Sequence, residues 1–226
     1  MNKKTAILIF ANSAEKELMS SSVASADFFE LLDSKTVKTV EKTGLPYFHY
    51  SEKEQIGNTF GERFTNAIDA IYNKGFNQVI TLGNDIPHLT ANHILKAKDK
   101  LNHSDVVLGP STDGGFYLMG FKQTHFNTTK IQNLPWQTKQ LRHCLNAELQ
   151  QQQIKTAYLE TLSDIDDASD FELILESFKP LDFKIKKLLL KLRKAIQTNS
   201  SFTAVFHDKS IFKKHHNKGS PILLHI

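Results

Sequence analysis

The chain alternates short apolar runs with longer amphipathic segments along most of its length, and few folds accommodate that order. Apolar runs of strand length predict strands over residues 5–10, 46–50, 78–82, 105–108, 116–121 and 154–159. Apolar side chains at helical spacing predict helices over residues 24–42, 58–73, 90–101, 137–153 and 168–178. Strands joined by helices of about a dozen residues or more need crossover connections, which give a mostly parallel sheet. We therefore predict an α/β, Rossmann-like single domain whose sheet is flanked by helices.

Charge is distributed unevenly along the 226 residues, whose net charge is +4. Residues 1–178 carry 17 Lys+Arg and 22 Asp+Glu, whereas residues 179–226 carry 11 Lys+Arg and 2 Asp. We expect the first range to form the catalytic-type domain and the second to be a basic C-terminal helical extension. Because the domain itself is mildly acidic, we do not expect it to bind nucleic acid.

The extension contains a segment, residues 183–196, with the pattern of a basic amphipathic helix. Ile185, Leu188, Leu189, Leu192 and Ile196 share one face, and the lysines lie elsewhere. Such a helix can lie on an anionic membrane surface, or it can pack on the domain with its basic face in water. The sequence leaves both interpretations open.

Cysteine use and the N-terminus bear on localisation. Cys144 is the single cysteine, so no internal disulfide can form, as suits a reducing compartment. The apolar run after the first residues is too short for a secretory signal, and we expect a cytoplasmic protein.

The most informative motif is the segment 83–87, Gly-Asn-Asp-Ile-Pro, directly after a predicted buried strand. Ligands of open α/β sheets bind beyond the carboxyl ends of strands, so Asp85 is placed where a site is expected. Gly83 permits a close approach of the backbone or a positive φ. A carboxylate there can hold Mg²⁺ or Mn²⁺ while the metal bridges a diphosphate, and Asp85 is the first predicted metal ligand. Alternatively, Asp85 caps the turn before the next helix.

Together with three further segments, this motif resembles the DUF2064 family of GT-A-type transferases. The family's Gly-x-Asp-x-Pro-x-Leu loop matches residues 83–89, and its Gly-Pro-x-x-Asp-Gly-Gly-Phe/Tyr-Tyr-Leu segment matches residues 109–118. Residues 57–63 resemble its Gly-Asp-Leu-Gly-x-Arg segment, and residues 135–138 resemble its Trp-Ser-Thr segment. The resemblance covers about residues 5–175 and implies a GT-A-like fold, a nucleotide-diphospho-sugar or nucleotide substrate, and a divalent metal.

The second candidate site is Asp113-Gly114-Gly115. Two glycines leave the backbone amides open to a sugar or phosphate, so Gly114 and Gly115 are predicted to bind substrate. Asp113 is the predicted catalytic residue, because an inverting transfer needs a base for the attacking hydroxyl. The alternative is a Gly-Gly hairpin turn in which Asp113 is only a turn residue.

The third candidate is the acidic segment 164–171, which resembles a late Asp-x-Asp segment of many GT-A chains. That resemblance implies a second metal ligand at Asp166. Capping of the following helix explains Asp167 and Asp170 well, and for Asp166 the metal-ligand and capping interpretations are equally supported. Arg63 and Trp136 are further predicted substrate-binding residues, for a phosphate and for a sugar or base; surface exposure and packing are their ordinary alternatives.

The chain departs from the family at residues 11–18. Family members follow the first strand with a Pro-x-x-Gly-x-x-Lys-Thr-Arg loop thought to hold the nucleotide, and this loop has no glycine, proline or Lys-Thr-Arg. Asn58 also replaces the family's aspartate. Three functions remain: glycosyl transfer from a nucleotide diphosphate sugar, nucleotidyl transfer from a nucleoside triphosphate, and a non-catalytic GT-A-like binding module. The sequence does not indicate donor, acceptor, stereochemistry or oligomeric state.

Overall fold

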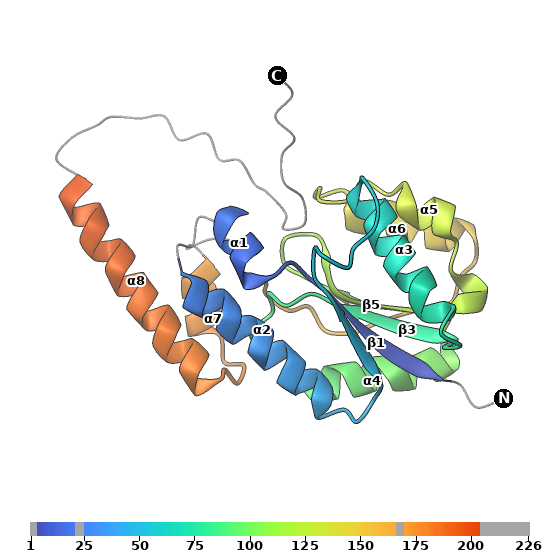
Figure 1. Cartoon of the computed structure of the whole chain (residues 1–226), viewed down its shortest axis with the longest axis horizontal. Coiled ribbons are helices and arrows are strands. Elements are labelled where there is room, and N and C mark those ends of the chain that lie inside the picture. The colour runs from blue at the N-terminus through green and yellow to red at the C-terminus, as the bar shows by residue number, and fades with distance from the viewer. Residues whose placement is uncertain (1–3, 21–24, 166–169, 204–226) are drawn as a thin grey trace, which may run out of the picture.

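A computed structural model describes residues 4–20, 25–165 and 170–203 of the chain. Its centre is a six-stranded sheet in the order β2-β1-β3-β5-β4-β6 (Figure 1). The strands are β1 (Thr5–Phe10), β2 (Tyr47–Tyr50), β3 (Gln78–Leu82), β4 (Val106–Pro110), β5 (Phe116–Lys122) and β6 (Thr156–Tyr158). The predicted α/β fold with a mostly parallel sheet is confirmed.

Strand β5 alone runs antiparallel to its neighbours, β3 and β4. The reason lies in the connection that precedes it. Only residues 111–115 join β4 to β5, and a crossover to a parallel neighbour needs a dozen residues or more. The chain therefore turns back on itself, and β5 is inserted between β3 and β4.

The helices are α1 (Ala14–Ser20), α2 (Ala26–Glu41), α3 (Phe60–Tyr72), α4 (Ala91–His103), α5 (Thr128–Gln132), α6 (Leu141–Gln151), α7 (Asp170–Glu176) and α8 (Phe183–Thr203). The five helices predicted in residues 1–178 begin and end within a few residues of the predicted positions, whereas α1 and α5 were not predicted and α8 extends beyond its predicted end. Thr59 caps α3 in a reciprocal capping box with Glu62, which fixes where that helix starts. Ser25 caps α2 by accepting a hydrogen bond from the amide of Phe28.

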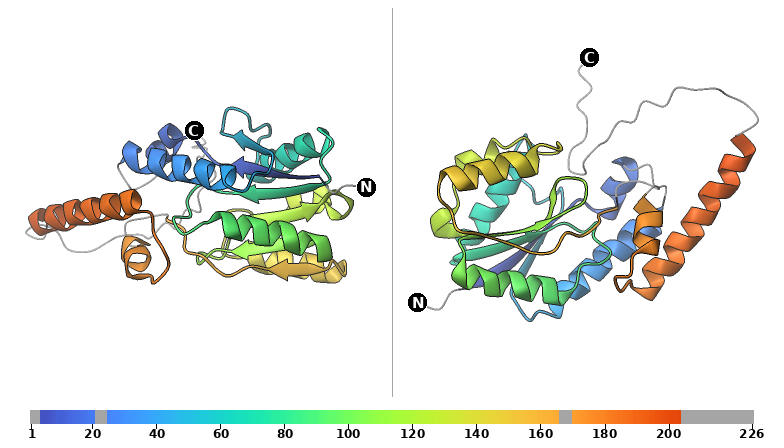
Figure 2. Two further views of the ribbon diagram at one scale, coloured as in Figure 1. Left: turned by 90° about the horizontal axis from the view of Figure 1, so that it is seen from below. Right: turned by 180° about the vertical axis from the view of Figure 1, so that it is seen from behind.

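Two apolar clusters hold helices against opposite faces of the sheet. On one face, side chains such as Leu8 and Val79 pack against α3, α5 and α6. On the other face, Ile7 and Ile80 pack against α4 and the end of α2. Figure 2 shows the resulting three layers, with helices on both sides of the strands.

A third cluster lies beyond the edge of the sheet and joins α2, α7 and α8. Phe28 of α2, Phe171 of α7, and Ile185 and Leu189 of α8 are buried in it. The division that we predict between residues 178 and 179 therefore falls between two helices that share one core. Within the described residues, no helix has both the length and the apolar character that a membrane span requires.

Candidate active site

A cleft opens at the edge of the sheet where β1 and β3 end and β5 begins. Counting the space that is open to solvent, it measures about 920 Å³. Leu82 at the end of β3, Ser111 after β4 and Phe116 at the start of β5 all line it. Because β5 is antiparallel, its first residue meets the carboxyl ends of β1 and β3 at the same edge. This is the position predicted for ligands of an open α/β sheet.

The charged side chains that line the cleft are all acidic. They are Glu17, Asp85, Asp113 and Asp164, and no Lys, Arg or His is among the described lining residues. Aromatic rings form much of the remaining wall, from Phe10, Phe60, Phe64, Phe116, Tyr117 and Trp136. The cleft thus combines apolar surface with carboxylates, and a bound phosphate would need a cation from outside the described protein side chains.

The loop that carries Asp85 is held tightly at the cleft wall. A Cβ on Gly83 would lie 3.0 Å from Oδ1 of Asp85, a tight contact that a small movement of the carboxylate would relieve. The amide of Ile165 donates to the carbonyl of Asp85 at 3.1 Å, which joins this loop to the acidic segment. Lys35 of α2 donates to the carbonyls of Ile86 (3.3 Å) and Leu89 (2.6 Å). Burial lowers the pKa of Lys35 to about 8, against the opposing effect of Asp182.

The same loop also contacts the C-terminal extension. Nδ1 of His88 lies 3.1 Å from the carbonyl oxygen of Pro180, and the His88 side chain is buried. Burial lowers the pKa of His88, so its imidazole is neutral at pH 7. The extension therefore packs directly behind the loop that presents Asp85.

Asp113 is part of a tight turn between β4 and β5. Its Oδ1 accepts hydrogen bonds from the hydroxyl of Ser111 and from the amide of Gly115 at 2.8 Å. Gly114 has φ +100°, where a side chain would be strained, and does not line the cleft, whereas Asp113 and Gly115 do. The segment is therefore a hairpin turn, as the alternative interpretation of the sequence had it. The same turn fixes the Asp113 carboxylate at the cleft wall.

The acidic segment contributes Asp164, a residue the sequence did not single out. It is buried, lines the cleft, and accepts a hydrogen bond from the hydroxyl of Thr112 at 3.1 Å. Asp166, the predicted second metal ligand, lies outside the described residues. In the described part of the chain, no group of three or more His, Cys, Asp or Glu side chains is arranged to hold a metal. Asp85 and Asp164 nevertheless give two carboxylates on adjacent loops of one cleft.

Trp136 and Gln137 close the cleft on the side of α3. The indole ring packs between Phe60 and Phe64, at centroid distances of 4.9 and 4.8 Å, and its N–H donates to the carbonyl of Ile131 at 2.8 Å. Trp136 is therefore chiefly a packing residue with one edge at the cleft. Gln137 follows it with φ +63°, and its buried Nε2 has no hydrogen-bond partner within the described residues. Sequence reasoning missed Gln137, because glutamine gives no signal of a left-handed backbone.

Arg63 lies apart from the cleft, on the first turns of α3. Its guanidinium is 3.5 Å from the carbonyl of Asn58 and 6.0 Å from the Phe60 ring, and it is not among the lining residues. The glycines of the same motif pack closely. A Cβ on Gly61 would lie 2.0 Å from the carbonyl oxygen of Gln132, so this segment lets α3 contact the end of α5.

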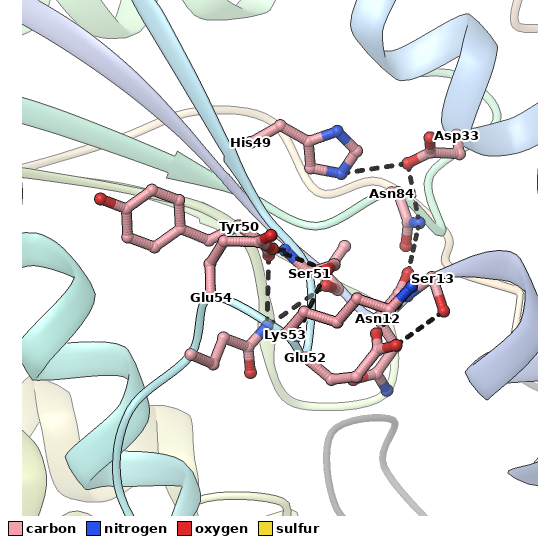
Figure 3. Close-up of polar contacts among 12 residues, drawn as sticks. Asn12, Ser13, Asp33, His49, Tyr50, Ser51, Glu52, Lys53, Glu54 and Asn84 are labelled. Atoms are coloured by element: carbon pink, nitrogen blue, oxygen red, sulfur yellow. Dashed lines mark hydrogen bonds and ion pairs between the residues drawn. The ribbon is translucent and has the colours of Figure 1, made fainter.

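The atypical loop after β1 forms the short helix α1, which the sequence did not predict. At its start, Glu52 accepts hydrogen bonds from the Ser13 amide (2.8 Å) and hydroxyl (2.9 Å) (Figure 3). Burial disfavours ionisation of Glu52, but the hydrogen bonds from Ser13 outweigh it and the pKa is lowered. A protein carboxylate thus accepts the hydrogen bond of the loop amide at Ser13.

A second polar chain in Figure 3 ties this loop to the Asp85 loop. The Asn84 amide donates to the Asn12 carbonyl (3.4 Å) and to Asp33 (3.3 Å), and His49 lies 3.4 Å from the same Asp33 carboxylate. Asn12 in turn donates to the buried Glu17, which reaches the cleft from α1. Glu17 had no sequence signal, because the helix that places it was not predicted.

With this geometry in place, comparison with known proteins is informative. The family model described as "Uncharacterized protein conserved in bacteria (DUF2064)" matches residues 32–138. The resemblance to DUF2064 is confirmed. The matched range holds the Asp85 loop, the Asp113 turn and Trp136. No curated protein matches the chain significantly in sequence.

Solved structures share the fold. A candidate nucleotide-diphospho-sugar transferase of Desulfovibrio desulfuricans G20 is 19% identical with a TM-score of 0.67, covering 86% of this chain and 97% of that one. The Mycobacterium tuberculosis protein Rv0371c is 9% identical with a TM-score of 0.50, covering 78% of this chain and all of that one. A cytidylyltransferase from Leptospira borgpetersenii aligns at a TM-score of 0.41 and 15% identity, over 94% of this chain and 100% of that one. The first two structural alignments show that this chain shares their fold, and they do not show which reaction it catalyses.

Proposed function

We propose that this protein transfers a glycosyl group from a nucleotide diphosphate sugar, with the sugar held in the cleft beside Asp113. The observation that carries the proposal is the wall formed by Gln137 and the turn at residues 111–115. An unsatisfied buried amide costs about 1–3 kcal/mol, and a left-handed glutamine adds backbone strain. Because Nε2 is buried, the Gln137 side chain must first rotate towards the cleft; a sugar hydroxyl that then accepts from Nε2 and donates to a carboxylate would offset that cost.

A divalent cation fits the donor set of the cleft when a diphosphate supplies the other ligands. Mg²⁺ commonly takes one or two protein carboxylates and fills its shell with phosphates and water. Asp85 and Asp164 are such a pair, and Asp166 follows Asp164 by two residues. The cation would supply neutralisation of the charge that develops on the leaving diphosphate. The described lining residues include no basic side chain, which is consistent with a cation, rather than a lysine or arginine, neutralising the diphosphate.

The turn at residues 111–115 gives Asp113 its role in the proposal. Its carboxylate is oriented by Ser111 and by the amide of Gly115 before any substrate arrives. A base fixed in this way can accept the proton of an attacking hydroxyl without a reorganisation cost. Asp113 is therefore our candidate for the general base.

Two observations weigh against nucleotidyl transfer. A nucleoside triphosphate brings more negative charge than a diphosphate sugar and needs more cationic contacts. The described cleft offers carboxylates instead, and Glu52 already holds the amide of Ser13. The Glu52 contact equally favours a second candidate, a binding module that retains the sugar site and has lost the reaction.

A thermal-shift panel of UDP-, GDP- and ADP-sugars, with and without Mn²⁺, tests the proposal first. A ligand at 100 times its Kd adds about 2.7 kcal/mol, which corresponds to about 5–10 °C in a chain of this size. Asp85→Asn should abolish the Mn²⁺-dependent part of the shift. Asp99→Asn is the matched control, since Asp99 is exposed on α4 away from the cleft.

Product analysis then separates the candidates. Release of a nucleoside diphosphate, lost in Asp113→Asn, supports glycosyl transfer. Binding without turnover for every donor and acceptor supports the binding module. Release of pyrophosphate from a nucleoside triphosphate would overturn the proposal in favour of nucleotidyl transfer.

Gln137→Gly tests the observation that carries the proposal. Glycine relieves the left-handed strain and removes the amide, so the thermal midpoint should hold or rise while affinity for the sugar nucleotide falls about 5- to 100-fold. Gln153→Gly is the matched control, because Gln153 has φ +54° and lies outside the cleft. Equal affinity in the two variants would contradict the role given to Gln137.

A further inference from the structure

Helix α8 has one face in the core and one face in water. Ile185 and Leu189 are buried in the third cluster, and Leu188 and Leu192 pack against it. Figures 1 and 2 show α8 at the edge of the molecule, with α2 and α7 on its inner side. Its opposite side contacts no other described element in these views.

The outer face combines large apolar side chains with lysines. Phe183 is 78% exposed and Leu190 is 39% exposed, seven residues apart and therefore two turns along one stripe. The exposed lysines 187, 191 and 194 lie on or beside that stripe. We call these five residues the outer face of α8. Phe178, fully exposed just before the helix, adds a third large apolar side chain near its start.

Charge on this helix has a single sign. Residues 183–203 contain no Asp or Glu, although the domain as a whole is acidic. Arg193 pairs with Glu172 of α7 at 3.2 Å, so that cation belongs to the inner side. Lys187 and Lys191 of the outer face form no ion pair within the described residues. A basic face with an apolar stripe matches helices that lie in the plane of an anionic bilayer surface.

We propose that the outer face of α8 docks this protein on an anionic membrane surface. Phe183 and Leu190 would enter the boundary of the acyl chains, and the lysines would reach the anionic headgroups with their stems along the apolar stripe. This inference concerns a surface separate from the cleft, and it does not depend on the transfer reaction.

Other occupants are disfavoured by charge. Residues 204–226 carry four Lys and one Asp, so this part of the chain is repelled by the face rather than attracted to it. A second copy in a two-fold dimer would place the same lysines against one another. An anionic bilayer satisfies the lysines and the apolar stripe together.

Sedimentation of the full-length protein with vesicles tests the proposal. Vesicles of phosphatidylcholine with about one third phosphatidylglycerol should bind the protein, and pure phosphatidylcholine should not. Raising the salt from about 0.1 to 0.5 M should weaken binding at least 10-fold, because the headgroup attraction is screened. Lys187→Gln with Lys191→Gln should weaken it about 30-fold, at roughly one kcal/mol per lysine.

The apolar stripe has its own variant and control. Phe183→Ser with Leu190→Ser should also release the protein from anionic vesicles. The double variant Lys96→Gln with Lys139→Gln is the control for the lysine variant, and Ile56→Ser is the control for the apolar variant. These three residues are exposed elsewhere on the surface, and both controls should bind as the parent does. All variants should keep the parent's thermal midpoint, because none touches the third cluster.

Three results would overturn the proposal. The first is equal binding to neutral and anionic vesicles, or binding to neither. The second is a concentration-dependent dimer that the Phe183 and Leu190 substitutions dissolve while vesicle binding is absent. The third is a salt-sensitive affinity for a duplex DNA fragment that exceeds the affinity for anionic vesicles.

Discussion

Gly61→Ala should destabilise the fold by forcing α3 away from α5. The new Cβ would lie 2.0 Å from the carbonyl oxygen of Gln132, well inside the ordinary contact distance of 3.4 Å or more. It would also lie 3.0 Å from Cδ1 of Trp136. The Gln132 oxygen belongs to the backbone, so relief requires a helix to move rather than a side chain to rotate.

The magnitude follows from two opposing effects. Overpacking that shifts backbone costs about 3 kcal/mol at the upper end of its usual range. Alanine in a helix interior returns about 1 kcal/mol relative to glycine. The net loss is about 2 kcal/mol, or about 4–8 °C in the thermal midpoint of a chain of this length.

Urea and thermal unfolding followed by tryptophan fluorescence provide the assay. Trp136 is the single tryptophan, and it packs against the residue-61 end of α3, so its emission reports on this contact in the folded state. We expect a changed native emission together with the lower midpoint. Asn92→Ala, at an exposed position of α4, is the control in which the helix propensity acts alone. A Gly61→Ala protein that is more stable than its parent would refute the packing argument.

The remaining predictions concern an amine, a carboxylate and a core ring. Burial lowers the pKa of Lys35 from 10.5 to about 8, so the unfolded chain binds this proton more tightly than the folded one. The free energy of unfolding should therefore rise by about 3 kcal/mol as the pH increases from 8 to 10.5. Urea titrations of Lys35→Met should lack that rise. A Lys35→Met protein with the parent's pH profile would contradict the assignment. Glu52→Gln should cost about 1 kcal/mol at pH 7, because Ser13 loses a charged acceptor. The lowered pKa of Glu52 means that this contribution is present above its ordinary pKa near 4.5 and is lost as the pH falls through the folded value, so parent and variant should converge in acid. Phe28→Ala should cost about 3–5 kcal/mol and unfold α2, α7 and α8 in one transition, whereas separate transitions would show that the third cluster is not shared.

Sequence periodicity was sufficient for most of the regular elements, because burial of one face dictates it, but it did not predict the short helices α1 and α5. Strands β1 and β3 are buried at every residue and were predicted to the residue. Helix α3 was predicted within two residues at its start, where Thr59 and Glu62 give a local signal. The antiparallel direction of β5 was not predicted, although the short connection before it contains the necessary information.

The site was less accessible, because contacts between distant residues decide it. The Asp85 loop and the Asp113 turn meet in one cleft as the strand-end rule predicts. Arg63 does not line the cleft, because the direction of its side chain depends on the rotation of α3 about its axis against the sheet. Glu17 and Gln137 carry no local pattern: one reaches the cleft through an unpredicted helix, and the other through a left-handed backbone. The hydrogen bond from Ser13 to Glu52 joins residues that are 39 apart in the sequence, so residue spacing could not predict it.

The contact between His88 and Pro180 has a practical consequence for shortening this protein. The Asp85 loop rests on the chain that leads into α8, and Ile185 and Leu189 of α8 seal the cluster beside it. A protein cut at residue 178, where the charge changes sign, would lose the acceptor for His88 and expose Phe28 and Phe171 to water. We therefore expect that the change in charge does not mark a place where the chain can be cut, and that a minimal fragment that retains the cleft extends through Leu192.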